Sequence, residues 1–247
     1  MERADRAPLG TFHAPGAWGP AVELSEGAAH HATVKRLSVG DPVRLTSGDG
    51  RRVLATISEL SKRKLVVSTV GESVEQLPPL SHVELWAPVG DRERMLWLAE
   101  KATELGLTTW RPVIYQRSRS VTPRGEGDAF REKVRARMIN ALEQSGGAWL
   151  PEVLPEVTLD DALKNAGDAS GGLLLDAAGE SLTESLSRFT SHASRLTLSL
   201  GPEGGLTPAE RDSFQDAGWG LASLGPNVLR FETAGIAALA IVRSHQW

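Results

Sequence analysis

Two short stretches near the C-terminus decide the fold: Gly-Pro-Glu-Gly-Gly at residues 201–205 and Leu-Gly-Pro-Asn-Val-Leu-Arg-Phe-Glu-Thr-Ala at residues 224–234. Each stretch follows a short apolar run typical of a buried strand, and the interval between them has room for one helix and one strand. Strands that alternate with helices form parallel sheets, so we expect both loops to leave the same edge of a sheet. Open α/β sheets bind their ligands at that edge.

The residues around the two loops support this interpretation. Thr207, Pro208 and Glu210 follow the first loop in the order of a capping box with proline at the first helical position, which predicts a helix start. Arg230 and Glu232 lie at the turn before an apolar helix predicted over residues 232–242. The glycines are also compatible with tight structural turns, and Glu232 with a role in complementing the helix dipole.

The residues from 77 onward predict an α/β fold. The expected strands cover residues 83–86, 110–115, 173–175, 196–200 and 221–224, and the expected helices cover residues 92–105, 128–144 and 181–189. This alternation predicts a mainly parallel sheet.

The first part of the chain has a different pattern. β-Branched runs at residues 43–46, 52–57 and 65–70 are separated by polar turns, which predicts a small antiparallel barrel or sandwich. Residues 71–79 end in two prolines and are typical of a linker. We therefore expect two domains, residues 1–76 and 77–247.

Composition excludes several kinds of chemistry. The 247 residues include no cysteine, so the chain has no disulfide, thiolate metal site or cysteine nucleophile. No two of its six histidines are four residues apart, and we expect no metal site. No apolar run is long enough to span a membrane and no secretory signal is evident, so we expect a cytoplasmic protein.

The net charge of −4 conceals a local excess of basic residues. Basic side chains outnumber acidic ones between residues 111 and 137, and further basic groups occur at residues 51–52 and 62–64. Such groups can contact the phosphates of a nucleic acid, or they can form a solvated face with no partner.

The two loops, together with Lys-Ala-Thr-Glu-Leu-Gly at residues 101–106 and Glu-Gln-Ser-Gly at residues 143–146, resemble the RsmE family of 16S rRNA (uracil-N3)-methyltransferases. The resemblance covers nearly the whole chain and includes His31 and residues 34–41. Four separated motifs agree in order and spacing. The chain departs from the family pattern at Asn227 and Gly147, where arginine is usual, and at Lys35, where leucine is usual.

This resemblance implies a SPOUT methyltransferase. A PUA-like RNA-binding β-barrel in residues 1–76 would precede an α/β methyltransferase domain in residues 77–247. A trefoil knot and the S-adenosylmethionine site would lie in about residues 170–247. It also implies a homodimer with active sites near the subunit interface, acting on 16S rRNA or the small ribosomal subunit. The knot rests on the resemblance alone, because threaded chains are very rare.

The resemblance also assigns roles to individual residues. The cofactor pocket would be lined by Leu175, Leu200, Gly201, Glu203, Gly204, Gly205, Leu224, Gly225, Val228 and Leu229. The barrel would contact RNA through Arg6, His31, Lys35 and Arg36.

The absence of cysteine agrees with methylation at N3. Methylation at C5 of uracil generally needs a cysteine thiolate to add to C6, whereas N3 needs only to lose its proton before attack on the methyl group. Glu232 is the expected acceptor of that proton, and Arg230 is expected to stabilise charge on a uracil oxygen.

Other functions are compatible with the same residues. A SPOUT enzyme could act at another RNA position, including ribose 2′-O, or a degenerate domain could bind RNA without modifying it. A nucleotide-phosphate binder fits less well, because no Gly-x-x-x-x-Gly-Lys pattern accompanies the glycines.

Overall fold

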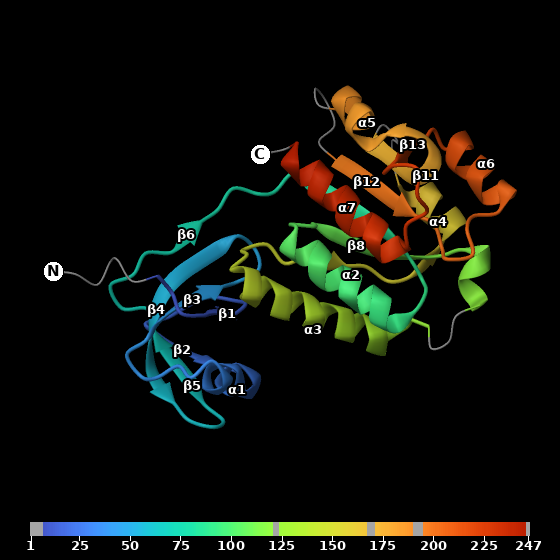
Figure 1. Cartoon of the computed structure of the whole chain (residues 1–247). Helices are drawn as coiled ribbons and strands as arrows, with labels where there is room; N and C mark the ends of the chain where they lie inside the picture. Colours follow the sequence, from blue (N-terminus) through green and yellow to red (C-terminus); the bar gives the residue numbers. More distant parts are fainter. Residues whose placement is uncertain (1–6, 121–123, 167–170, 190–194, 246–247) are drawn as a thin grey trace. The chain divides into compact units, whose positions relative to one another are not determined.

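The computed structural model describes residues 7–120, 124–166, 171–189 and 195–245, which fall into two compact units (Figure 1). The first unit contains the residues up to Pro79 together with Ile139–Leu150, and the second contains Leu80–Met138 and the residues from Pro151 onward. The domain boundary that the sequence predicts after residue 76 stays a prediction. Nothing in the sequence pattern indicated that Ile139–Leu150 would group with the N-terminal residues.

The first unit is built on one curled sheet, helix α1 and the C-terminal part of a helix, α3 (Asp128–Ser145), that begins in the second unit. Its elements are β1 (Thr11–His13), β2 (Ala21–Leu24), α1 (Glu26–Val34), β3 (Pro42–Thr46), β4 (Arg51–Leu60), β5 (Leu65–Ser68) and β6 (Glu75–Gln76). The strand order is β1-β3-β4-β5-β2, with β6 on β4. Alternate side chains of the middle strands are buried, including Val43, Leu45, Val53 and Ile57, so one face of the sheet forms the core.

The three β-runs predicted at residues 43–46, 52–57 and 65–70 are confirmed as β3, β4 and β5. These three strands pair antiparallel, as predicted, whereas β1 pairs with β3 in parallel, which the sequence did not predict. The N-terminal segment also contains a helix, α1, which begins where the Ser25 hydroxyl accepts a hydrogen bond from the Ala28 backbone N–H. His31 therefore lies on a helix, and residues 35–41 connect this helix to β3.

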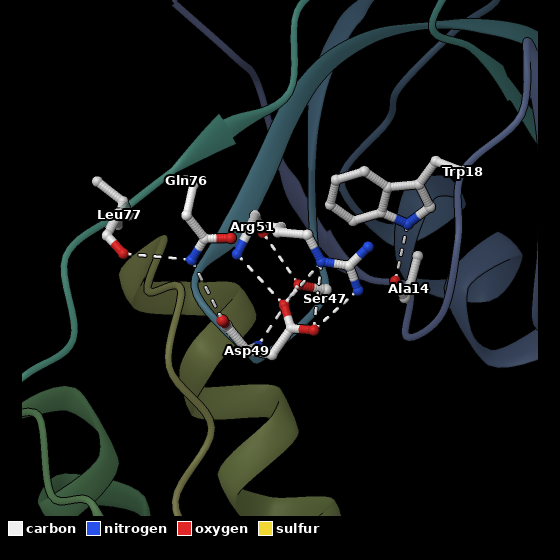
Figure 2. A network of polar contacts seen from close by, with 7 residues as sticks. All are labelled: Ala14, Trp18, Ser47, Asp49, Arg51, Gln76 and Leu77. Carbon is white, nitrogen blue, oxygen red and sulfur yellow. Dashed lines mark hydrogen bonds and ion pairs between the residues drawn. The ribbon is translucent and has the colours of Figure 1, made fainter.

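Asp49 holds the turn between β3 and β4 together (Figure 2). Its carboxylate accepts hydrogen bonds from Arg51, at 2.8 Å from Nη2, and from the Ser47 hydroxyl. These two donors hold the pKa of Asp49 well below its usual range. The Arg51 guanidinium also lies over the Trp18 ring, 5.5 Å from its centre, so its charge is used within the unit.

The second unit is an α/β domain with a parallel sheet. Its strands are β7 (His82–Pro88), β8 (Thr109–Ile114), β9 (Glu152–Val153), β10 (Val157–Thr158), β11 (Gly172–Ser181), β12 (Arg195–Leu200) and β13 (Gly220–Ser223). The strand order is β10-β8-β7-β12-β11-β13, with β9 on β8. Each of these described pairings is parallel, which confirms the predicted α/β class.

Helices cover this sheet. They are α2 (Arg92–Glu104), α4 (Leu159–Asn165), α5 (Leu182–Phe189), α6 (Pro208–Asp216) and α7 (Phe231–Ser244), with a 3-10 helix, η1, at Gln116–Ser120. Helix α3 begins in this unit and ends in the first. Figure 1 shows α2 and α7 packed side by side. Helices α4 and α6 contribute to an apolar cluster around Trp86 of β7, whose ring centre lies 4.6 Å from that of Trp219.

Arg243 fixes the C-terminal end of α7 to the rest of the unit. It is a buried side chain that donates to the Ser81 carbonyl at 2.9 Å and to the Gly106 carbonyl just beyond α2. Burial lowers the pKa of Arg243 to about 10. Its position near the last carbonyls of α2 also matches the preference of helix C-termini for cations.

Many of the basic side chains that the sequence offered for phosphate contacts have acidic partners. The pairs are Arg51 with Asp49, Arg52 with Glu75, Arg63 with Glu26, Lys64 with Glu59, Arg131 with Asp128 and Arg137 with Glu100. The local excess of basic residues is therefore partly offset within each unit.

None of the helices in the described ranges is both long and apolar enough to cross a bilayer. The same residues contain no cluster of three or more His, Cys, Asp or Glu side chains that could hold a metal ion. The trefoil knot stays a prediction.

Gly50 tests the packing of the first unit. A Cβ at this position would lie 2.3 Å from Cζ2 of Trp149, whereas a Cβ on Gly16 would meet nothing within 4 Å. Both glycines have a φ of +95°, so Gly50→Ala and Gly16→Ala carry the same backbone strain and differ in the clash. We expect Gly50→Ala to lose about 1–3 kcal/mol more stability than Gly16→Ala in urea unfolding. Equal losses would contradict the packing described here.

Candidate active site

A cavity of about 480 Å³ opens in the second unit at the carboxyl ends of β12 and β13 and beside the middle of β11. Nearly all of the predicted cofactor residues line it: Leu175, Leu200, Gly201, Glu203, Gly205, Leu224, Gly225, Val228 and Leu229. The two loops at residues 201–205 and 224–234 follow β12 and β13, so the sequence correctly predicted that they share one edge of the sheet. This volume lies within the range of about 300–1,000 Å³ that is usual for small-molecule sites.

A break in β11 shapes one wall of the cavity. Leu175 and Glu180 both pair with Ala222 of β13, so residues 176–179 loop out between two stretches of regular pairing. Gly179 permits this, because a Cβ there would lie 2.5 Å from the backbone nitrogen of Ala222. The backbones of β11 and β13 can approach only with glycine at this position.

The first loop is held by contacts from both of its sides. The predicted capping box is confirmed: the Glu210 carboxylate accepts from the Thr207 backbone N–H at 2.8 Å, and also from the Gln116 N–H at 2.7 Å. Arg117 of η1 donates to the Gly204 carbonyl at 2.8 Å. Gly204 thus faces Arg117 and is absent from the cavity lining, unlike its neighbours in the loop.

The cavity is mainly apolar, with ion pairs at its wall. Asp176 and Arg211 lie 2.7 Å apart, and the Asp176 side chain is almost fully buried. Glu203 pairs with Arg94, which reaches the first loop from the first turn of α2. The arrangement suits a ligand that has a flat apolar part and carries charges of both signs.

A second cavity, of about 440 Å³, adjoins the first. Arg94 and Arg230 line both cavities, while Glu232 and Trp97 line the second. Glu232 lies in the first turn of α7 and is only 6% exposed. Its Oε1 lies 3.9 Å from Nε of Arg94, and its buried Oε2 has no hydrogen-bond partner among the described residues.

Glu232 thus lines the second cavity but not the first. A buried carboxylate oxygen without a donor is costly unless a ligand supplies one. Arg230 lines both cavities and Glu232 lines the second, so the two predicted catalytic residues share the second cavity.

The predicted RNA-binding residues lie in the first unit or outside the described range. Lys35 and Arg36 are exposed just after α1, and Arg36 has a left-handed backbone with a φ of 58°. His31 is engaged internally, with Nδ1 3.3 Å from Oε2 of Glu143 and its ring edge-on to Phe12. Arg6 lies outside the described residues.

Sequence reasoning missed Arg94, Arg117 and Arg211 as residues of this region. Arg117 and Arg94 precede the two loops in the chain by about a hundred residues, and no pattern links them to the loops. Arg211 had a weak signal, because it lies one turn into the capped helix that follows the first loop.

Two family models match this chain, and they define its class. The family model for the RNA methyltransferase domain matches residues 76–243, and the model for the RNA methyltransferase PUA domain matches residues 24–70. The chain belongs to the ribosomal RNA small subunit methyltransferase E family, in agreement with the resemblance found in the sequence.

Two relatives and one solved structure illustrate the similarity. The chain is 32% identical to ribosomal RNA small subunit methyltransferase E of Rickettsia conorii, over 90% of this chain and 89% of that protein. It is 29% identical to the Bacillus subtilis protein of the same name, over 90% of each chain. The crystal structure of the Neisseria gonorrhoeae protein, bound to S-adenosylmethionine, superimposes with a TM-score of 0.82 at 26% identity, over 96% of this chain and 97% of that one.

Gly201 tests the assignment of the first cavity. It lines the cavity, and a Cβ at this position would meet Leu206 at an ordinary contact distance of 3.5 Å. We expect Gly201→Val to fold normally and to weaken binding of S-adenosylmethionine by at least about tenfold, because the isopropyl group occupies ligand space. Calorimetric titration measures the affinity and thermal unfolding is the control. Unchanged affinity would place the cofactor elsewhere.

Proposed function

We propose that this protein transfers a methyl group from S-adenosylmethionine to N3 of a specific uridine in 16S (small-subunit) ribosomal RNA. The observation that carries the proposal is the buried carboxylate oxygen of Glu232, which has no hydrogen-bond partner among the described residues and lines the second cavity together with Arg94 and Arg230. Family membership and the relatives' names support the substrate class.

The first cavity fits S-adenosylmethionine. Its apolar walls at Leu175, Leu200 and Leu224 suit the adenine ring, and the Asp176–Arg211 pair offers both signs of charge to the polar groups of the cofactor. When bound, S-adenosylmethionine supplies an electrophilic methyl group on a sulfonium. The Neisseria gonorrhoeae relative, whose fold this chain shares, was crystallised with this molecule.

Glu232 is the group that removes the N3 proton. A carboxylate within hydrogen-bond reach of a weakly acidic N–H can accept its proton as the methyl group is attacked. Arg230 stabilises the charge that gathers on a uracil oxygen as the proton leaves. The absence of cysteine leaves no thiolate for the C5 route.

The first unit holds the RNA. The RNA methyltransferase PUA domain model matches residues 24–70, a range that includes His31, Lys35 and Arg36. Lys35 and Arg36 are exposed. His31 pairs with Glu143, so any contact of His31 with RNA would compete with this internal contact.

A homodimer with active sites near the subunit interface is part of the proposal. Val228 at the cofactor cavity is 95% exposed, and Leu229 beside it is 37% exposed. Exposed apolar side chains next to a ligand site are typical of surfaces that another chain covers.

The main alternatives are methylation of a ribose 2′-O and RNA binding without chemistry. A ribose hydroxyl also needs a base, so Glu232 alone does not distinguish these reactions. The position of the methyl group in the product distinguishes them directly.

The variant Glu232→Gln tests the proposed base. It preserves the shape of the side chain but removes its capacity to accept a proton, so we expect methyl transfer to fall by at least about 10²-fold. Binding of S-adenosylmethionine should stay within about twofold, since Glu232 does not line the first cavity. Transfer is measured with radiolabelled cofactor and small ribosomal subunits. Full activity in this variant would eliminate Glu232 as the base.

The double variant Lys35→Gln/Arg36→Gln tests the RNA surface. Each lost phosphate contact should reduce the slope of log affinity against log salt by about 1. The control is Arg63→Gln, another highly exposed cation of the first unit, which pairs with Glu26 at 3.4 Å. An unchanged slope in the double variant would refute the placement of RNA on this surface.

A further inference from the structure

The second cavity has a chemistry that matches one edge of uracil. The Watson–Crick edge of uracil presents an acceptor, a donor and an acceptor in sequence: O4, N3–H and O2. A protein reads a base of single-stranded or flipped-out RNA by hydrogen bonds to this edge and by stacking on its face. The matching site needs a carboxylate between two cationic donors.

Arg94 and Arg230 are the two arginines that share both cavities, and Glu232 lies with them in the second. Both arginines line both cavities, and Nε of Arg94 lies 3.9 Å from Oε1 of Glu232. Nη1 of Arg94 is held by Glu203, while no described residue accepts a hydrogen bond from its Nη2. Arg94 therefore has donor capacity left over after its contact with Glu203.

The location of Arg94 is unfavourable for the helix that carries it. It is the third residue of α2, whose N-cap is Asp91, and its backbone N–H donates to that cap. A cation in the first turn opposes the helix dipole, which favours acidic residues there. Its guanidinium instead pairs with Glu203 and lies 3.9 Å from the Glu232 carboxylate.

We propose that Arg94 is a further substrate-binding residue, and that Arg94, Glu232 and Arg230 together bind the Watson–Crick edge of the target uracil in the second cavity. The inference rests on the proposed function and deepens it. Glu232 accepts the N3–H, and each arginine donates to one of the two flanking carbonyl oxygens.

The same arrangement serves the reaction. As the N3 proton moves to Glu232, the N3 electron pair forms the new bond to the methyl carbon, and the electrons of the broken C–S bond return to sulfur. The guanidinium groups stabilise the negative charge that develops on the carbonyl oxygens before methyl transfer.

The same three side chains, Arg94, Glu232 and Arg230, also select uracil over cytosine. Cytosine has no proton on N3 and carries an amino group where uracil has O4. It would place an acceptor against the Glu232 carboxylate and a donor against a guanidinium. A site that leaves its buried polar groups unpaired in this way rejects the wrong base strongly.

Trp97 provides the stacking surface. Its side chain lines the second cavity and is 47% exposed, so a base can reach it. Stacking of a base on an aromatic side chain contributes about 1–3 kcal/mol in single-stranded RNA complexes.

The test compares Arg94→Gln with the wild type on two kinds of small ribosomal subunit. One is assembled on ordinary 16S rRNA, and the other on 16S rRNA in which 5-fluorouridine replaces uridine. The N3 proton of 5-fluorouridine is more acidic, so its anion needs less stabilisation. We expect Arg94→Gln to lower kcat about 10²-fold on uridine and less than about tenfold on 5-fluorouridine. Arg94→Lys, which keeps a cation, should recover part of the activity on uridine.

The matched control is Arg92→Gln, in the same helical turn, where the guanidinium packs 5.3 Å from the centre of the Phe130 ring. It should lower kcat on both substrates by the same small factor. Equal losses for Arg94→Gln on both substrates would assign Arg94 a purely structural role and overturn the proposal. If the wild type makes no N3-methyl product, the proposed function itself fails, and the role of Arg94 with it.

Discussion

The parallel pairing of β11 between β12 and β13 is the constraint on which the site depends. Because the three strands run in the same direction, the loops after β12 and β13 leave the same edge of the sheet and line the first cavity together with the middle of β11. The break in β11 at residues 176–179 widens this edge without ending the strand. Gly179 makes the break possible, because any side chain there would collide with the backbone of β13.

Charged side chains from α2 and α7 line the second cavity, beside this edge. Glu232 is buried in the first turn of α7, a position that the helix dipole favours for a carboxylate. Arg94 comes from α2, which packs against α7, so the contact between these two helices sets the distance between the guanidinium and the carboxylate. Arg94 and Glu232 thus both lie on helices, while the first cavity is lined largely by loop and strand residues.

The sequence predicted the second unit well because periodicity, glycine loops and the capping box at Thr207 are local signals. It predicted the first unit less well. Helix α1 is short and buries only alanines, so it has no apolar stripe to detect, and the parallel pairing of β1 with β3 is a long-range contact. Arg94 could not be predicted as a site residue, because its contacts with Glu203 and Glu232 join segments more than a hundred residues apart.

The central claim is methylation of N3 of one uridine in 16S rRNA. The most direct measurement is nucleoside mass spectrometry of 16S rRNA from cells that lack this protein, compared with the same cells carrying the wild-type chain. The account predicts that one 3-methyluridine is absent without the protein and returns with it. An unchanged set of modified nucleosides, or loss of a 2′-O-methyl nucleoside instead, would contradict it.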